Sequence, residues 1–395
     1  MKECRKRCGW GFCAAVLVLC CAIEPAVACT GFVAGKKASA TGWTIVAHNE
    51  DNGGPLVLRH ALVPAASPAP MFDEPGRAKI PNVAKTCSFF WSEVKSKKGQ
   101  PPPGDLFLNE NGVLVFSNNG GVQAKWDGVS YALPDEGPAS TCTDGGLGHN
   151  LRLAVAQRAR TAAEGVAIVT NLVSTWGYAN RSRMFTIADC NEAWIVEVIQ
   201  GRRYVARRCP DEEVMAYPNC LTIGRLRAGD VCSPEIKAKG SSFDFSKAYQ
   251  GPRKWTSPYN FHRMLDLYRL TAGVKLDGLS EYPFSVRPGH VITIPDIKRG
   301  LSSHYEGCPY EVKDRHPPKS RSESVCVPIC RSSTLESVIC EFGASPAETV
   351  LYVATGRPCQ TPYFRSRPFA GVCPPDTVFG ADALQRLRDH AKALR

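Results

Sequence analysis

The first 28 residues determine where the folded chain begins. A basic start, MKECRKR, precedes the apolar stretch GFCAAVLVLCCAI at residues 11–23. Pro25 ends this stretch, and Ala-Val-Ala at residues 26–28 supplies the small side chains of a signal-peptidase cleavage site. The apolar stretch is too short to span a bilayer comfortably. We therefore expect residues 1–28 to be a cleaved signal peptide, and an exported chain (periplasmic, extracellular or at the cell surface) that begins at Cys29 and has no membrane span.

The composition is that of a globular protein with an ordinary core. Of the 395 residues, 44% are apolar and 22% are charged, which excludes intrinsic disorder as the main state. The net charge of +11 is scattered along the chain. Nucleic-acid-binding proteins concentrate positive charge on one face or tail, so we expect no nucleic-acid partner. No internal repeat is visible, and we expect residues 29–395 to fold as a single large domain.

Cysteine is abundant after the predicted cleavage site. Five of the 18 cysteines lie in the leader, which leaves thirteen in the mature chain. An exported chain with so many thiols is expected to form disulfide bonds, but an odd number leaves at least one thiol unpaired within the chain. Their pairing cannot be read from the sequence. Cys326 and Cys330 lie closest together and lack the spacing of a zinc site, so we expect no metal or other cofactor.

Strands and helices follow one another without strict alternation. Apolar and β-branched runs predict strands at residues 29–35, 43–49, 106–116 (a hairpin turning at 109–112), 184–187, 193–199, 203–206, 221–223 and 349–354. Helical periodicity predicts helices at residues 151–173, 259–270, 334–342 and 382–395. Thr161 and Glu164 have the spacing of a capping box, which predicts a second helix inside the first of these segments. This order favours an α+β layered fold.

A mature N-terminal cysteine combines a nucleophile and a base in one residue. The thiol of Cys29 would be the nucleophile, and its own α-amine, with an unperturbed pKa of about 8, could accept the thiol proton. Activation of a side-chain nucleophile by the terminal amine is an established mode of covalent catalysis. The sequence therefore predicts Cys29 as the catalytic residue.

The segment CTGFVAGKKASATGWTIVAHNEDN at residues 29–52 resembles the start of the dipeptidase/secernin family of N-terminal nucleophile (Ntn) cysteine hydrolases. The resemblance continues in order through NENGVLVF, LRLAVAQRARTAAEGVAIV, FTIADCNEAWIVEVIQG, SHYEGCPYEV, STLESVICEF and VLYVATGRPCQTPYF, and so covers most of the mature chain. It implies a four-layer αββα sandwich and hydrolysis of dipeptides through a thioester on the N-terminal cysteine. Related folds include penicillin V acylase and bile salt hydrolase.

The resemblance also implies roles for individual residues. Cys29 matches the nucleophile, and Asp51 matches the acidic residue that orients its amine and thiol. Asn219 resembles the asparagine that donates a hydrogen bond to the oxyanion, and Asn119 resembles a second such donor. Arg263 resembles a helix-borne arginine near the site.

His48 departs from the family pattern. Related enzymes commonly carry an arginine three residues before the aspartate, and here that position is His48. Histidine donates hydrogen bonds but is charged only part of the time near pH 7. We predict that His48 is a substrate-binding residue. Either the substrate contact or the pH profile is expected to differ from that of relatives.

Two other functions remain open from the sequence. One is hydrolysis of a non-peptide amide, as in penicillin V acylase and bile salt hydrolase. The other is a non-catalytic surface protein whose Cys29 carries lipid, because Ala-Val-Ala-Cys is a poor but not impossible lipobox. The substrate is accordingly a dipeptide or another small amide. The sequence leaves open the dipeptide side-chain preference and the oligomeric state, a homo-oligomer included.

Overall fold

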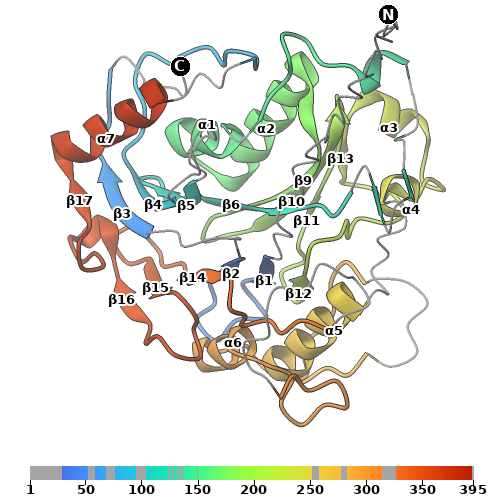
Figure 1. Cartoon of the computed structure of the whole chain (residues 1–395), viewed down its shortest axis with the longest axis vertical. Helices are drawn as coiled ribbons and strands as arrows, with labels where there is room; N and C mark the ends of the chain where they lie inside the picture. The colour runs from blue at the N-terminus through green and yellow to red at the C-terminus, as the bar shows by residue number, and fades with distance from the viewer. Residues whose placement is uncertain are drawn as a thin grey trace, which may run out of the picture.

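Two sheets lie face to face between two layers of helices in the computed structural model of this chain (Figure 1). The structure describes residues 29–51, 58–67, 76–94, 104–122, 125–126, 129–130, 133, 137–148, 150–250, 258–276, 283–313 and 326–393. The predicted signal peptide at residues 1–28 lies outside this part of the chain. The arrangement is the αββα sandwich that the resemblance implies, so the expected α+β fold class is confirmed.

The smaller sheet carries the mature N-terminus. Its strands, in spatial order, are β12 (Val214–Tyr217), β1 (Thr30–Ala34), β2 (Ile45–Asp51), β14 (Thr334–Glu341), β15 (Val350–Thr355) and β16 (Phe364–Ser366). All neighbours in it run antiparallel. Residues 35–44, most of which lie between the two predicted strands, join β1 to β2. Thr30 pairs with Asn49 and Gly31 with His48, which fixes the register next to Cys29.

The larger sheet covers one face of the smaller one. Its strands, in spatial order, are β13 (Val231–Cys232), β11 (Arg203–Arg208), β10 (Ala193–Gly201), β9 (Tyr178–Ala188), β6 (Leu114–Asn119), β5 (Gly104–Asn109), β4 (Phe89–Val94), β3 (Leu58–Val63) and β17 (Val378–Phe379). A separate hairpin pairs β7 (Lys125–Trp126) with β8 (Val129–Ser130). The predicted hairpin is β5–β6, and Gly112 adopts a positive φ of 77° in its turn.

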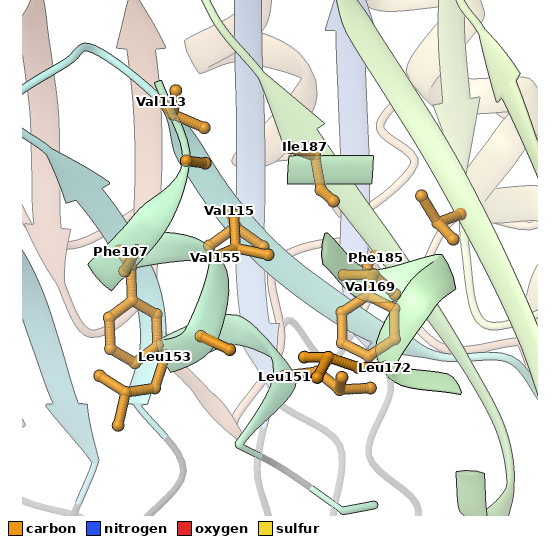
Figure 2. Close-up of a cluster of buried hydrophobic side chains, with 14 of the residues drawn as sticks. Phe107, Val113, Val115, Leu151, Leu153, Val155, Val169, Leu172, Phe185 and Ile187 are labelled. Carbon is orange, nitrogen blue, oxygen red and sulfur yellow. The ribbon is translucent and has the colours of Figure 1, made fainter. Parts of the chain in front are cut away.

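Helices α1 (Leu151–Arg158), α2 (Ala162–Trp176) and α7 (Gly380–Ala393) lie on the outer face of the larger sheet. Leu151, Leu153 and Val155 of α1 pack with Val169 and Leu172 of α2 on strand residues, among them Phe107, Val115 and Ile187 (Figure 2). The Thr161 hydroxyl accepts a hydrogen bond from the backbone of Glu164, as predicted, over 3.1 Å. The Glu164 carboxylate instead accepts from the backbone of Arg160, one residue before the cap.

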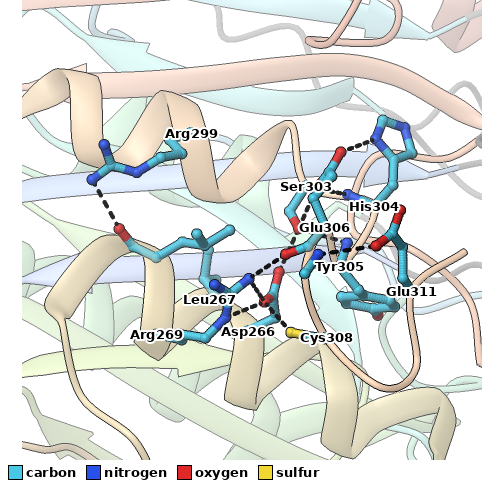
Figure 3. A network of polar contacts seen from close by, with 12 residues as sticks. Asp266, Leu267, Arg269, Arg299, Ser303, His304, Tyr305, Glu306, Cys308 and Glu311 are labelled. Atoms are coloured by element: carbon cyan, nitrogen blue, oxygen red, sulfur yellow. Dashed lines mark hydrogen bonds and ion pairs between the residues drawn. The ribbon is translucent and has the colours of Figure 1, made fainter.

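The second helical layer covers the outer face of the smaller sheet. It contains α5 (Pro258–Leu267), its continuation as a π-helical turn (Tyr268–Ala272), and α6 (Ile294–Leu301). Asp266 of α5 bonds Arg269 at 2.5 Å and also accepts from Ser303, which ties the loop after α6 to α5 (Figure 3). The remaining short helices are α3 (Pro234–Ala238), α4 (Phe245–Tyr249) and the 3₁₀ turns at Gly137–Ser140 and Pro368–Ala370.

The predicted helix at residues 334–342 is wrong, because this segment forms β14 between β2 and β15. Val338 and Cys340 face the core between the two sheets, whereas Ile339 faces the helices. Most of β14 is buried, and each of its faces carries both polar and apolar side chains, so the alternation that identifies a strand disappears. The segment is a strand because it pairs with β2 and β15, and β2 is far away in the sequence.

The predicted strand at residues 221–223 is also wrong. The backbone amides of Thr222 and Ile223 donate to the buried carboxylate of Glu197, at 2.5 and 3.2 Å. A side chain therefore satisfies the backbone groups that a neighbouring strand would otherwise bind. Within the described residues, no helix is long and apolar enough to cross a membrane.

Candidate active site

Cys29 lies immediately before β1, next to the end of β2. Continuing the register from Thr30 and Asn49 places Cys29 opposite Glu50, and cross-strand neighbours share a face. The Cys29 thiol donates to Oε2 of Glu50 over 3.2 Å, and its Sγ lies 4.0 Å from the backbone oxygen of Asp51. Cys29 is 1% exposed. The predicted nucleophile is thus buried beside a carboxylate.

Gly31 explains how a bulky ring can cover this strand. A Cβ on Gly31 would lie 2.3 Å from the Tyr217 ring, so only glycine leaves room for that contact. Tyr217 lies on β12, directly paired with Gly31, and its hydroxyl bonds Thr186 of the larger sheet. The tyrosine therefore closes the space between the sheets next to the nucleophile.

Arg263 holds the N-terminal segment in place from α5. Its Nη1 donates to the Cys29 carbonyl oxygen at 2.9 Å, and to the Thr30 hydroxyl at 3.3 Å. Its Nη2 donates to Asn260 at 2.9 Å, and its Nε donates to the backbone oxygen of Tyr259 at 2.8 Å. Because Arg263 is fully buried and bonded on all three nitrogens, it fixes the backbone from which the thiol projects.

Asn219 and Asn119 extend the same hydrogen-bond chain. Arg263 donates to Oδ1 of Asn219 at 3.2 Å, which aims the amide nitrogen of Asn219 away from the arginine. That nitrogen donates to the backbone oxygen of Asn119 at 3.2 Å. An amide nitrogen carries two hydrogens, so one remains for an oxyanion. The Asn119 side-chain oxygen accepts from the backbone of Gly121 at 2.8 Å, as in a tight turn.

Asp51 faces away from the thiol, because neighbouring residues of a strand point to opposite faces. Its Oδ1 accepts from the Thr334 hydroxyl at 2.5 Å, and its Oδ2 is buried with no hydrogen-bond partner among the described residues. Burial raises the pKa of Asp51 from 3.8 to about 6. The nearby Arg331 guanidinium and the Thr334 hydrogen bond act in the opposite direction and favour the ionised form.

His48 lies on the same face as Glu50. Its ring stacks on Phe116 of the larger sheet, with ring centroids 4.4 Å apart. A ring nitrogen of His48, the Cys29 sulfur and a Glu50 carboxylate oxygen lie within 4.8 Å of one another. The structure therefore brings all six residues singled out from the sequence into one region around Cys29.

Glu50, Arg183 and Arg331 were not identified as site residues from the sequence. Glu50 could have been found, because it follows His48 by two residues and so shares its face in a strand. Burial lowers the pKa of Arg183 on β9, because it disfavours the charged form. The effect of the Tyr178, Cys29 and Glu50 side chains is larger, and the pKa of Arg183 is raised above its ordinary value. No local sequence signal places Arg183 near Cys29.

Two groups of side chains are of the types that bind metal ions. Within the described residues they are Cys29 with His48 and Glu50, and His304 with Cys330 and Cys359. The first group includes the predicted nucleophile itself. The second lies near the loop after α6, where the Nδ1 of His304 bonds Glu306 at 3.1 Å.

Comparison with known proteins places the chain in a family. A model described as Peptidase family C69 matches residues 138–369, which is more than half of the chain.

This chain belongs to Peptidase family C69.

Curated relatives in this group are named as dipeptidases. A dipeptidase of Bifidobacterium longum is 26% identical over 340 residues, which cover 72% of this chain and 60% of the relative. Dipeptidase A of Lactobacillus helveticus is 26% identical over 314 residues, covering 72% and 62%. A probable dipeptidase of Salmonella dublin is 25% identical over 367 residues, covering 85% and 80%. The chain thus spans about 60% of the length of the first two relatives.

Among solved structures, a mutant conjugated bile acid hydrolase from Clostridium perfringens aligns with a TM-score of 0.38 and 10% identity. The alignment covers 89% of this chain and 98% of that one. Such a likeness is too weak to support an argument about this chain.

Proposed function

We propose that this C69 family member is an exported cysteine dipeptidase with Cys29 as its N-terminal nucleophile. The observation that carries the proposal is the bonding around Cys29. Arg263 holds the Cys29 carbonyl, the thiol contacts Glu50, and Asn219 is oriented by the same arginine. The dipeptidase names of the relatives support the choice of substrate.

The proposed reaction begins once cleavage after residue 28 exposes the α-amine of Cys29. The amine accepts the thiol proton, and the sulfur attacks the carbonyl carbon of the peptide bond. Asn219, with Asn119 as a second donor, holds the oxyanion, and one such donor can be worth about 3 kcal/mol of transition-state stabilisation. The protonated amine then gives its proton to the departing amino acid, which leaves a thioester on Cys29. Water hydrolyses the thioester and restores the thiol.

Asp51 has a distinct part in this proposal. Its buried Oδ2 has no hydrogen-bond partner among the described residues and lies on the strand opposite the start of β1. A carboxylate there favours the protonated form of the Cys29 amine, which is the form that follows proton transfer. Export also implies an oxidising environment, in which we expect disulfide bonds to form between thiols that lie in contact.

Substitution of Cys29 tests the mechanism. Purified mature protein should hydrolyse dipeptides, and Cys29→Ala should lose that activity while keeping its thermal unfolding transition. Cys87→Ala is the matched control and should leave activity unchanged. Cys87 is a half-buried thiol that contacts Asn111 of the β5–β6 turn. Full dipeptidase activity in Cys29→Ala would contradict the proposed nucleophile.

A substrate panel separates the proposal from its main alternative. The wild-type protein is assayed on dipeptides, penicillin V and conjugated bile acids. The proposal predicts turnover of dipeptides and little turnover of the bulky acyl amides. Activity on the acyl amides alone would replace the dipeptidase by an amidase of the other type.

A further inference from the structure

Two acidic residues lie opposite one another on the face of the smaller sheet that carries the nucleophile. Glu50 of β2 pairs with Glu336 of β14 in the sheet register. Side chains directly opposite in an antiparallel pair share a face, with Cβ atoms about 4.5–5.5 Å apart. Glu50 reaches Cys29 Sγ at 3.2 Å. The Glu336 carboxylate is therefore the next acidic group beyond Glu50 on this face.

Glu336 is held at one oxygen only. Its Oε1 accepts from the Ser92 hydroxyl at 3.0 Å and lies 3.1 Å from Nε2 of His60, both on the larger sheet. The residue is 0% exposed, and its Oε2 has no hydrogen-bond partner among the described residues. A buried carboxylate oxygen without a partner is costly to the fold, and a hydrogen-bond donor bound there would offset that cost.

Two side chains of the larger sheet lie beside these carboxylates. His60 contacts Glu336, and Arg183 is close enough to Glu50 for the carboxylate to stabilise its charge. Like charges directly opposite one another in a sheet are destabilising. Arg183 offsets part of this repulsion on the Glu50 side, and a cationic group between the two carboxylates would offset more of it.

We propose that Glu50 and Glu336 bind the α-ammonium group of the substrate. In a dipeptide the amino nitrogen is attached to the carbon next to the scissile carbonyl. When Cys29 attacks that carbonyl, the ammonium must lie within a few ångströms of the sulfur, which is where Glu50 lies. An ammonium has three N–H donors and can bond both carboxylates at once. This inference rests on the proposed dipeptidase activity and narrows it to substrates with an unmodified amino terminus.

The adjacent carboxylate Asp51 does not compete for this role. Asp51 points to the other face of β2, toward Thr334. In the proposed mechanism Asp51 stabilises the Cys29 ammonium, and Glu50 and Glu336 remain for the substrate ammonium. The competing role for Glu50 is that of a base for the thiol, because the thiol donates to it. A base would act on every substrate, whereas an ammonium partner acts only on those with an amine.

That difference gives the test. L-alanyl-L-alanine and its N-acetyl derivative are assayed with wild type, Glu50→Gln and Glu336→Gln. We expect each substitution to lower kcat/KM for the unmodified dipeptide by about 10- to 100-fold, the range expected for a lost charged hydrogen bond. For the N-acetyl derivative, which should be hydrolysed slowly, kcat/KM should stay within about threefold of the wild-type value. Glu192→Gln is the control, since Glu192 lies in the turn between β9 and β10 and bonds Arg208 in a partly exposed pair. An equal loss on both substrates would overturn the inference in favour of a base or a structural role.

Binding to an inactive variant separates this inference from the proposed function. Cys29→Ala should bind L-alanyl-L-alanine, and adding Glu50→Gln should weaken binding by about 10- to 100-fold, without effect on the N-acetyl derivative. If wild type hydrolyses no dipeptide yet this binding difference is found, the dipeptidase proposal fails and the ammonium site stands. If dipeptides are hydrolysed but their binding to Cys29→Ala is indifferent to Glu50→Gln, the ammonium site is overturned.

Discussion

At the scale of single residues, adjacent positions on β2 carry carboxylates with different surroundings. Glu50 contacts the Cys29 thiol on one face, and Asp51 bonds Thr334 on the other. The pKa of Asp51 is raised to about 6 by burial, so this residue changes charge inside the range in which enzymes are assayed. In the proposed mechanism, only the ionised form of Asp51 stabilises the ammonium of Cys29.

Thr334 offers a way to shift that protonation. Because the proposed mechanism requires ionised Asp51, we expect its protonation to lower kcat/KM as pH decreases through about 6, in addition to the effect of protonating the Cys29 amine. The Thr334 hydrogen bond lowers the pKa of Asp51, so Thr334→Val should raise it and move the acid limb of the pH profile to higher pH. Thr334→Ser keeps the hydroxyl and should leave the limb in place. An unmoved limb in Thr334→Val would show that another group titrates there.

At the scale of elements, local sequence patterns correctly predicted the elements that pack against the next element along the chain. The hairpin β5–β6 follows from its turn residues, and the pair α1–α2 follows from apolar periodicity and the Thr161 cap. Strand β14 was misassigned, because each of its faces carries both polar and apolar side chains, which removes the alternation of a strand. Residues 221–223 were misassigned, because Glu197 lies far away in sequence and no local pattern indicates that it binds their amides.

Gly165 in α2 gives an element-scale prediction. Glycine in a helix interior is ordinarily about 1 kcal/mol worse than alanine. Here a Cβ would lie 2.7 Å from Ile187 and 3.2 Å from Val155, so the helix packs against β9 and α1 through this glycine. Gly165→Ala should therefore lower the free energy of unfolding, by about 1–3 kcal/mol, in denaturant titrations. Asn171→Ala, at an exposed position on the same helix, should leave it unchanged or raise it slightly. A more stable Gly165→Ala would contradict this packing.

At the scale of the whole molecule, the candidate site is assembled from segments far apart in the chain. Cys29 and Glu50 lie near the start, Asn219 and Arg263 in the middle, and Glu336 near the end. The resemblance to known hydrolases indicated Cys29, Asn219 and Arg263 from the sequence, but not Glu50. It could not indicate that β14 pairs with β2, and so the closeness of Glu336 to Glu50 emerged only from the sheet topology.

The thiols give a prediction at the same scale. The Cys330 and Cys359 side chains contact each other, and burial raises the pKa of the Cys330 thiol. In an oxidising compartment a disulfide-bearing oxidant would accept two electrons from this pair and leave a Cys330–Cys359 bond. Peptide mass mapping of exported protein should find this cross-link without reductant and two alkylated thiols after reduction. Alkylation of both thiols without reduction would contradict the pairing.

The central claim is that Cys29 is the mature N-terminus and the nucleophile. Active protein is treated with just enough iodoacetamide to abolish dipeptide hydrolysis. Mass analysis of its N-terminal peptide then tests both parts of the claim together. We predict a chain that begins at Cys29, with an unblocked amine and one carbamidomethyl group on that residue, and protection of the thiol by substrate. A chain that begins elsewhere, a lipidated Cys29, or inactivated protein in which Cys29 is unmodified would contradict it.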